Sequence, residues 1–583
     1  MYPEKSQSEG MTGKSASFSL SFSFSGLWKM IGFLLIILFF VLPVFRLIII
    51  SMTEEDAFTL SHYSDVFRDI ETWITVKNTL FIVFGSTVVS LILGIAMAWI
   101  IAYVNIKRKK WMQLFIFLPF IIPSYITTIA WVQFFSSSGP AAAILNLVPG
   151  EWPAPNLYSM GGIIFVLGLS HYPLVYLMTV NVLKKIPPEL AQAAQTSGGR
   201  KTLIFRKIIF PLALPGVASG GLLAFLSNLD NFGIPAFLGI PANIRVLSTY
   251  IYEQVIGFGP SAFAKAAVLS VLLGMIALTG TFLQWLLLKR SRVIETVKND
   301  DKPRVHLPKA KRRCVEGIVW VFLLFTSFVP LLSMGATSLI KAYGLPFKPE
   351  NLSLKNYQYL LFSDPKAISA VSNSLKLAVL TVSLSLILGT ALAYIRYKQP
   401  NRWTKAIEMF VTVPYALPGT VFALCIIFAW MQPLPGWNPG VYGTIWIVML
   451  AYFTRFLVLQ VRGSYTALTQ VDSTMEEAAR ISGATAVVKW RKILLPLLLP
   501  GIIGGALLVF LTALTELTVS SLLWSAGSET IGVVIFNYEQ AGFTTYSTAF
   551  SCLIVLAILI GGLAFIVLEK FWLRKVMKQN DPA

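Results

Sequence analysis

The feature that most constrains the fold of this 583-residue chain is a series of twelve long apolar segments. A helix needs about 20 apolar residues to cross roughly 30 Å of hydrocarbon, and each segment approaches or exceeds that length. They cover residues 28–50, 78–104, 112–134, 160–182, 212–238, 262–288, 317–340, 372–395, 406–430, 442–461, 497–523 and 546–571. Because 56% of the residues are hydrophobic and only 13% are charged, a soluble globular fold is excluded. We therefore expect an all-α, polytopic membrane protein of about twelve transmembrane helices.

The positive charge of the chain predicts its orientation in the membrane. The net charge is +20, and most of the 47 lysines and arginines lie in short clusters between alternate pairs of apolar segments. Basic residues are retained on the cytoplasmic side, so this alternation places both termini in the cytoplasm. A nucleic-acid binder would gather its basic residues on one accessible face, and this pattern argues against that class.

An internal repeat divides the chain into two halves. Residues of the second, third and related segments recur 295 positions later: Asn78, Gly94, Ala98, Pro119 and Pro123 return as Asn373, Gly389, Ala393, Pro414 and Pro418. Each half holds six segments, and an even number makes the two repeats parallel and related by a pseudo-twofold axis along the membrane normal. We expect a tail at 1–27, a first half at 28–288, a basic cytoplasmic linker at 289–315, a second half at 316–573 and a tail at 574–583. The paired prolines are expected to kink the third and ninth helices.

A polar, alanine-rich loop also occurs twice, on the predicted cytoplasmic side between the fourth and fifth segments of each half. Ala193, Ala194, Ser197, Gly198, Arg206, Lys207, Ile208, Pro211, Pro215 and Gly216 match the residues 285 positions later, from Ala478 to Gly501. We expect a short surface helix, with a Glu476–Arg480 pair one turn apart and Gly483 as a turn after its end. One copy alone could be a solvated connector, but two copies favour a docking surface for a two-lobed or dimeric cytoplasmic partner.

The loop resembles the EAA loop of binding-protein-dependent ABC importer permeases. Glu477-Ala478-Ala479 carries all three letters, whereas the first copy has Gln192 in place of the acidic residue. The resemblance implies that both loops form coupling helices, each seated on one of two ABC ATPase subunits. The residues it assigns to this contact are Gln192, Ala193, Ala194, Gly198, Glu477, Ala478, Ala479 and Gly483.

The same resemblance implies the partners and location of the chain. The ATPase subunits would bind ATP and Mg²⁺ and rock the halves between inward and outward openings, so this chain would need no cofactor and would not itself be an enzyme. An extracytoplasmic binding protein would deliver the substrate, and the chain would lie in a bacterial inner membrane. Two halves fused in one polypeptide are most similar to ferric-iron importer permeases. Thiamine and aminoethylphosphonate permeases share that layout, and nothing in the segments distinguishes ferric iron from these or from a polyamine.

Five polar residues within the apolar segments are candidates for the translocation path: His171, Asp230, Asn231, Arg455 and Glu516. Ionisable groups inside a membrane are costly and mark either transport paths or interhelical bonds that fix packing. Asn231 and Glu516 occupy equivalent positions of the repeat, and His171 and Arg455 adjacent ones. No metal site is assigned, because Cys314, Cys425 and Cys552 lie far apart without ligand spacing.

Other classes of membrane protein fit less well. A secondary transporter of the major facilitator type has the same six-plus-six layout, but residues 104–111 lack its Gly-x-x-x-Asp-Arg signature. A membrane enzyme is disfavoured because the three histidines fall in different predicted compartments and no HExxH or GxSxG motif occurs. A passive channel would leave the duplicated loop unexplained.

Overall fold

The computed structural model describes residues 24–54, 57–147, 149, 155–257, 261–289, 302–433 and 438–579. Most of the predicted tail at 1–27, residues 290–301 of the predicted linker and the last four residues lie outside these ranges. Across the described part the regular structure is helical, apart from two isolated bridges and one short hairpin in which β1 (Thr53–Glu54) pairs antiparallel with β2 (Ala57–Phe58). The all-α architecture expected from the apolar segments is confirmed.

The first half contains the following helices in chain order. They are α1 (Phe24–Ile36), η1 (Ile37–Val41), α2 (Leu42–Ser51), α3 (Ser61–Arg68), α4 (Ile70–Tyr103), α5 (Lys109–Ile121), α6 (Ser124–Phe135), α7 (Pro140–Leu145), α8 (Met160–Leu183), α9 (Pro188–Thr196), α10 (Lys201–Ile204), η2 (Phe205–Ile209), α11 (Phe210–Asp230), α12 (Gly233–Leu238), α13 (Leu247–Ile256) and α14 (Ala262–Lys289).

The second half follows the same order for its long helices, with different short elements between them. Its helices are α15 (Lys309–Ser327), α16 (Val329–Ser338), η3 (Pro349–Asn351), α17 (Lys355–Gln358), η4 (Tyr359–Ser363), α18 (Pro365–Lys398), α19 (Arg402–Ala416), α20 (Gly419–Trp430), α21 (Ile445–Gln470), α22 (Ser473–Ile481), α23 (Ala486–Lys489), η5 (Trp490–Leu494), α24 (Leu495–Leu514), α25 (Ser520–Leu523), α26 (Ile531–Gln540) and α27 (Thr544–Gln579). The π-helical turns η2 and η5 fall at equivalent positions, so the repeat extends to local irregularities of the backbone.

Within the described ranges, ten helices are long and apolar enough to cross a membrane, and two further spans are bent pairs. In these pairs α5 and α6 meet at 99°, and α19 and α20 meet at 110°. The expectation of twelve spans therefore holds only if each bent pair counts as one. The kinks expected in the spans at 112–134 and 406–430 are present, and they are so sharp that each span is divided into two helices.

Proline chemistry accounts for the two breaks. Pro123 and Pro418 have no N–H to donate, and their rings push the preceding residues out of the helical region. Ile122 and Leu417 accordingly adopt extended backbone, with ψ of 132° and 143°. Pro119 and Pro414, by contrast, lie inside α5 and α19. Of each proline pair, the second residue therefore marks the break.

The predicted helices at 212–238 and 497–523 also extend too far. α11 ends at Asp230 and α24 at Leu514, and each is followed by a short separate helix, α12 or α25. Asn231 and Glu516 use their side chains to accept backbone N–H bonds from residues beyond the helix end, a local competition that favours turns over continued helix. These two residues lie in breaks rather than inside helices.

Each half extends its first span onto the surface of the other half. α1 and η1 contact α19, and α2 packs on α20; in return α15 packs on α5 and α16 on α6. Aromatic rings make both contacts: Phe39 stacks on Trp430 with 5.4 Å between ring centroids, and Phe115 meets Trp320 edge-on at 5.5 Å. The two halves are thus linked by exchanged helices.

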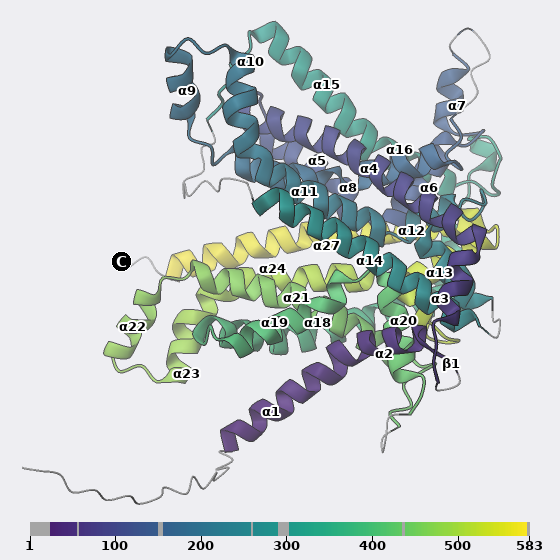
Figure 1. Ribbon diagram of the computed structural model, residues 1–583. Coiled ribbons are helices and arrows are strands. Elements are labelled where there is room, and N and C mark those ends of the chain that lie inside the picture. Colours follow the sequence, from purple (N-terminus) through teal and green to yellow (C-terminus); the bar gives the residue numbers. More distant parts are fainter. Residues whose placement is uncertain are drawn as a thin grey trace, which may run out of the picture.

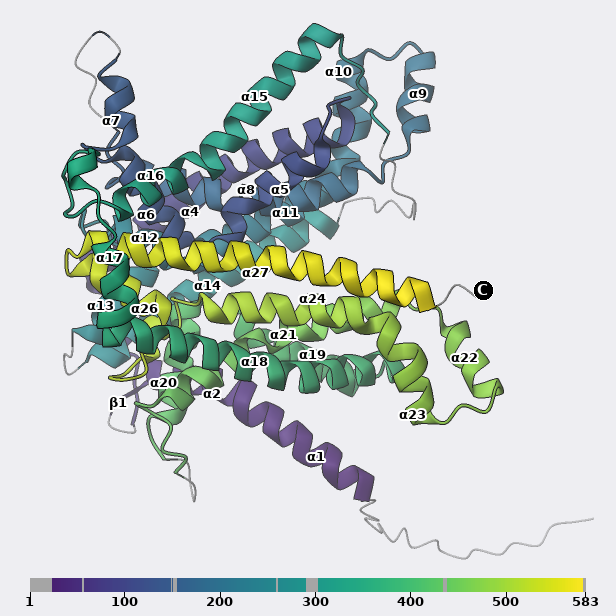
Figure 2. The same cartoon turned by 180° about the vertical axis from the view of Figure 1, so that it is seen from behind.

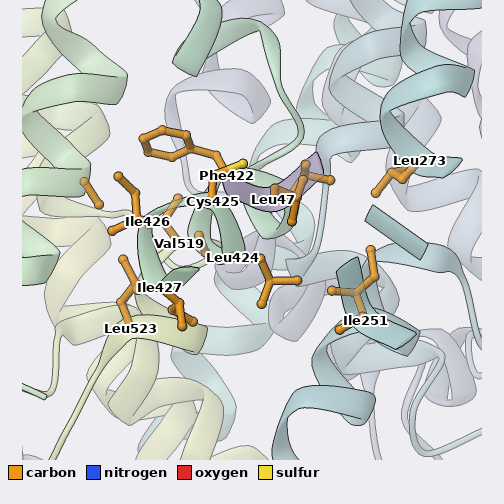
Figure 3. Close-up of a cluster of buried hydrophobic side chains, with 14 of the residues drawn as sticks. Leu47, Ile251, Leu273, Phe422, Leu424, Cys425, Ile426, Ile427, Val519 and Leu523 are labelled. Atoms are coloured by element: carbon orange, nitrogen blue, oxygen red, sulfur yellow. The ribbon is translucent and has the colours of Figure 1, made fainter. Parts of the chain in front are cut away.

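The remaining contacts between the halves gather at one end of the molecule. Figures 1 and 2 show α9 and α22 at opposite corners of one end, together with the end of α27, and α3 and α13 at the other end. One buried cluster joins α2, α13 and α14 of the first half to α20 of the second, and Figure 3 draws Leu47, Ile251 and Leu273 of the first half together with Leu424 and Ile427 of α20. A second cluster packs Phe232 of the first half against Phe536 of α26. These two clusters therefore join the halves at the end opposite α9 and α22, in addition to the exchanged helices.

Candidate functional site

The two repeated loops form short helices followed by the same turn. α9 carries Gln192, Ala193 and Ala194, and α22 carries Glu477, Ala478 and Ala479. After α9, the Gly199 N–H donates to the Ala194 carbonyl at 2.9 Å; after α22, the Ala484 N–H donates to the Ala479 carbonyl at 3.0 Å. Such bonds satisfy the carbonyls at a helix C-terminus and require left-handed backbone at the turn residue.

Glycine meets this requirement in both copies. Gly198 has φ of 81° and Gly483 has φ of 75°, a region that costs other residues roughly 1–2 kcal/mol. Both glycines are exposed, and a Cβ on either would have no atom within 4 Å. Their presence is therefore explained by backbone geometry, and the space around them is open.

The loops differ in how they are attached to the helices behind them. α9 buries no side chain: Gln192 and Ala193 are exposed, and Ala194 is half-buried. On α22, Glu477 and Ala478 are exposed, whereas Ala479 is buried. Both helices thus present exposed surface, but only α22 is seated against the core.

Glu476 attaches α22 to the helices behind it, and its ion-pair partners are not the expected Arg480. Its Oε2 accepts bonds from Lys398 Nζ at 2.6 Å and Lys489 Nζ at 3.1 Å, rather than pairing with Arg480 one turn away. Burial raises the pKa of the Glu476 carboxyl, but the bonds from the two lysines outweigh burial and hold the pKa below the usual 4.5. Sequence reasoning missed Lys398 because it lies at the end of α18, far along the chain from α22.

The second group of candidates lies where helix breaks from both halves meet. Arg455 of α21 is buried, and its Nη2 donates to the Asp230 carboxylate of the first half at 2.9 and 3.2 Å. The backbone N–H of Gly419, directly after the break before α20, also donates to Asp230. One carboxylate at the end of α11 therefore bonds a helix and a helix break of the other half.

Asn231 and Glu516 perform the same local task in their halves. Asn231 Oδ1 accepts the Ile234 N–H at 2.9 Å, and Glu516 accepts the N–H groups of Val519 and Ser520 at 2.9 and 3.0 Å. The residue spacing is identical, so each side chain accepts an N–H three residues later and holds the turn that leads into the short helix after the break. Asn231 also donates to Ser124 Oγ at 3.0 Å, which ties this break to the start of α6.

His171 belongs to a different group from Arg455, despite their adjacent positions in the repeat. Its Nδ1 lies 2.7 Å from Asn228 Oδ1, and Asn228 Nδ2 donates to Thr87 Oγ1 at 3.2 Å. All three side chains are buried within the first half. The positions equivalent to His171 and Asn228 in the second half are Phe456 and Ala513, so this polar network is confined to one half.

The structure thus brings together Asp230, Arg455 and Glu516, with Asn231 next along the chain. Glu516 interacts electrostatically with Arg455. Gly419 completes the group: a Cβ there would lie 2.6 Å from Thr518 Cγ2 and 3.1 Å from Arg455 Nη1, so the close approach requires glycine. Sequence reasoning missed Gly419, although its place directly after Pro418 was a signal. Among the described residues, no group of three or more His, Cys, Asp or Glu side chains could hold a metal ion.

Comparison with known proteins matches both halves to one family. The model of the binding-protein-dependent transport system inner membrane component matches residues 90–292 and 385–578. The chain is 25% identical to a putative ferric transport system permease of Haemophilus influenzae, over 85% of this chain and 77% of that protein. It is 24% identical to a ferric transport system permease of Actinobacillus pleuropneumoniae, over 90% of this chain and 75% of that protein.

One related protein of half the size aligns with part of the chain. A spermidine/putrescine transport system permease of Haemophilus influenzae is 27% identical over 44% of this chain and 94% of its own length. Because the family model covers most of both repeats, and relatives of the fused type align along most of the chain, the resemblance drawn from the repeated loop is confirmed. The chain belongs to the family of binding-protein-dependent ABC importer permeases, multi-pass inner-membrane components of such transport systems.

Proposed function

We propose that this permease imports ferric iron by alternating access, driven by two copies of an ABC ATPase subunit that dock on α9 and α22. The ATPases bind ATP and Mg²⁺, and this chain supplies no nucleotide site. α9 and α22 face the cytoplasm, as do both termini, and the opposite end receives substrate from an extracytoplasmic binding protein. We refer below to that opposite end as the outer end. Membrane lipid surrounds the chain, and nucleic acid has no part in its function.

The observation that carries this proposal is the bond between Asp230 and Arg455. Asp230 is the last residue of α11, at the end of that helix away from α9, so the bond joins the two halves toward the outer end, whereas α9 and α22 lie at separate corners of the cytoplasmic end. Apart from the exchanged first spans and residues 302–308, the two halves are joined at one end, and this arrangement can alternate with one joined at the other end if the ATPases draw α9 and α22 together. In that motion the Asp230–Arg455 bond must break, so these residues line the path when it opens outward.

Ferric iron is the proposed cargo because two relatives aligned along most of the chain are named for ferric transport. Carboxylates suit a hard cation, but iron can also pass as a chelate, whose anionic ligands would meet Arg455. A polyamine is the second candidate, favoured by the half-length spermidine/putrescine relative and by the acidic side chains of Asp230 and Glu516. Only the fused layout of the two halves supports thiamine or aminoethylphosphonate as the cargo.

The test is uptake by proteoliposomes that contain this chain, its ATPase and its binding protein. With MgATP inside, ⁵⁵Fe supplied as ferric citrate should accumulate, while ¹⁴C-spermidine should not; the reverse result would identify a polyamine importer. Accumulation driven by an ion gradient in vesicles that hold this chain alone would contradict the ATP-driven mechanism. A catalytically inactive ATPase is the matched control.

A further inference from the structure

The segment that enters the second half lies along the cytoplasmic loop of the first half. We call residues 302–308 the strap. The N–H groups of Arg304 and Val305 donate to the Tyr103 carbonyl at 2.8 and 2.9 Å, and the Asn105 N–H donates to the Val305 carbonyl at 3.1 Å. Asn105 Oδ1 also accepts the Leu307 N–H at 3.0 Å. The strap is therefore held by backbone bonds at the end of α4.

Arg304 extends this attachment to the base of α9. Its guanidinium carbon lies 4.5 Å from the centre of the Tyr103 ring, and its Nη1 donates to Tyr103 Oη at 3.2 Å. Its Nη2 donates to the carbonyl of Ile186, a buried residue two positions before the first residue of α9. Tyr103 in turn donates to the Leu183 carbonyl at the end of α8, at 3.1 Å. One side chain thus joins the end of α4 to the turn between α8 and α9.

The second half makes the equivalent connection without a strap. In the repeat, Tyr103 corresponds to Lys398, and it is Lys398 that bonds Glu476 of α22. The first half has Ala191 at the position of Glu476 and Ile204 at the position of Lys489, so neither ion pair of the second half can form there. Arg304 supplies a cation that stacks on Tyr103, the residue equivalent to Lys398.

We propose that Arg304 is a positioning residue that couples α9 to the transmembrane helices, and that the strap therefore takes part in transmitting motion through the first half. This inference rests on the proposed function, because it assigns α9 the transmission of ATPase motion. A helix that transmits force must be attached stiffly to what it moves, and α9 buries no side chain of its own. A planar guanidinium can lie flat on a ring while its edge donates in two fixed directions, whereas an ammonium has no plane to stack and its donors rotate freely.

The test measures ATP-driven opening of the outer end without needing any cargo. Gln133 of α6 lies next to Thr548 of α27 across the two halves, with 3.4 Å between Nε2 and Oγ1. Cysteines introduced by Gln133→Cys and Thr548→Cys, in a Cys314→Ser background, should be joined by a short thiol crosslinker. In the complete complex, MgATP with vanadate should lower the crosslink yield.

Four variants then separate the roles. Arg304→Ala should still assemble with the ATPase and hydrolyse MgATP. The decrease in crosslink yield that MgATP causes should, however, be roughly tenfold smaller than in the parent, the effect expected for loss of one charge-assisted hydrogen bond. Arg304→Lys should recover only part of the response. Asn105→Ala should reproduce the Arg304→Ala effect by releasing the strap. Lys311→Ala, which removes an exposed charge just after the strap, should match the parent protein.

The outcomes distinguish this inference from the function on which it rests. If Arg304→Ala and Asn105→Ala both respond to ATP like the parent, the positioning role is refuted. If Lys311→Ala fails equally, general charge rather than Arg304 is responsible, and the role is refuted as well. If the parent complex itself shows no docking on α9 or no response to ATP, the proposed function fails first. Crosslinking of each variant without ATP shows that it has folded.

Discussion

Replacing Asp230 with asparagine should shift the permease toward the state that is open at the outer end. The amide keeps an acceptor for the Gly419 N–H but removes the charge that Arg455 contacts at 2.9 Å. Since this bond joins the halves at the outer end only, its loss destabilises the state seen here and leaves the alternative unchanged. The equilibrium between the two states must then move.

The structure sets the size of the shift. Breaking a fully buried ion pair by removing one partner costs about 3–5 kcal/mol. The Arg455 side chain is 6% exposed but that of Asp230 is 39% exposed, so solvent screens part of the interaction. We expect about 2 kcal/mol, which corresponds to roughly a 30-fold change in the ratio of the two states.

Two measurements check this expectation. The yield of the crosslink between the cysteines introduced by Gln133→Cys and Thr548→Cys should fall in Asp230→Asn without ATP, and MgATP hydrolysis should rise without the binding protein. A double-mutant cycle with Arg455→Gln should show that the two effects are not additive. Asp65→Asn, which alters an exposed carboxylate on α3, is the control. Unchanged crosslinking and hydrolysis in Asp230→Asn, or additive effects in the cycle, would refute the role of this bond in holding the outer end closed.

Three further predictions concern a side-chain acceptor, a glycine turn and an ion pair. Asn231→Ala removes the acceptor of the Ile234 N–H and should cost about 1 kcal/mol in thermal unfolding of the purified protein, and an unchanged melting temperature would contradict this role of the side chain in the turn. Gly483→Ala should lose about 1–2 kcal/mol because of its positive φ, whereas Gly504→Ala, in equally open space inside α24, should gain up to about 1 kcal/mol; equal effects would disprove the conformational explanation. The pKa of Glu476 is lowered in the folded state, so its ion pairs stabilise the fold at pH values above the usual 4.5, and this contribution is lost as the pH falls below that value. The melting temperatures of the parent and Glu476→Gln should therefore differ near neutral pH and converge in acid.

The repeated features of the sequence predicted more of the structure than the apolar segments did. Matching residues at constant spacing located both halves and both loop helices, because each of these is a local pattern present twice. Hydropathy joined α11 to α12 and α24 to α25, since the residues after each break are as apolar as those before it. Prolines identified the third and ninth helices as irregular, but a missing N–H does not set the angle, which depends on what packs beside the break.

Contacts between distant parts of the chain could not be predicted in this way. The expected Glu476–Arg480 pair follows from helix spacing alone, whereas the observed partner Lys398 is brought close by the packing of α18 behind α22. Similarly, Asp230, Arg455 and Glu516 were selected because charges are rare inside apolar segments. That Asp230 bonds Arg455 in the other half depends on how the two repeats face each other, and no pattern within either repeat contains that information.

The exchange of first spans has a consequence for how this protein can be made and taken apart. α1 and α2 lie on the second half, and α15 and α16 lie on the first. We call these two hydrophobic segments, each packed against the opposite half, the arms. A protease cut between residues 289 and 302 would leave two interlocked fragments that stay together through electrophoresis under native conditions. Biosynthesis faces the converse problem: the first arm leaves the ribosome long before α19 and α20, which receive it, and its exposed face stays in the lipid until those two helices are inserted.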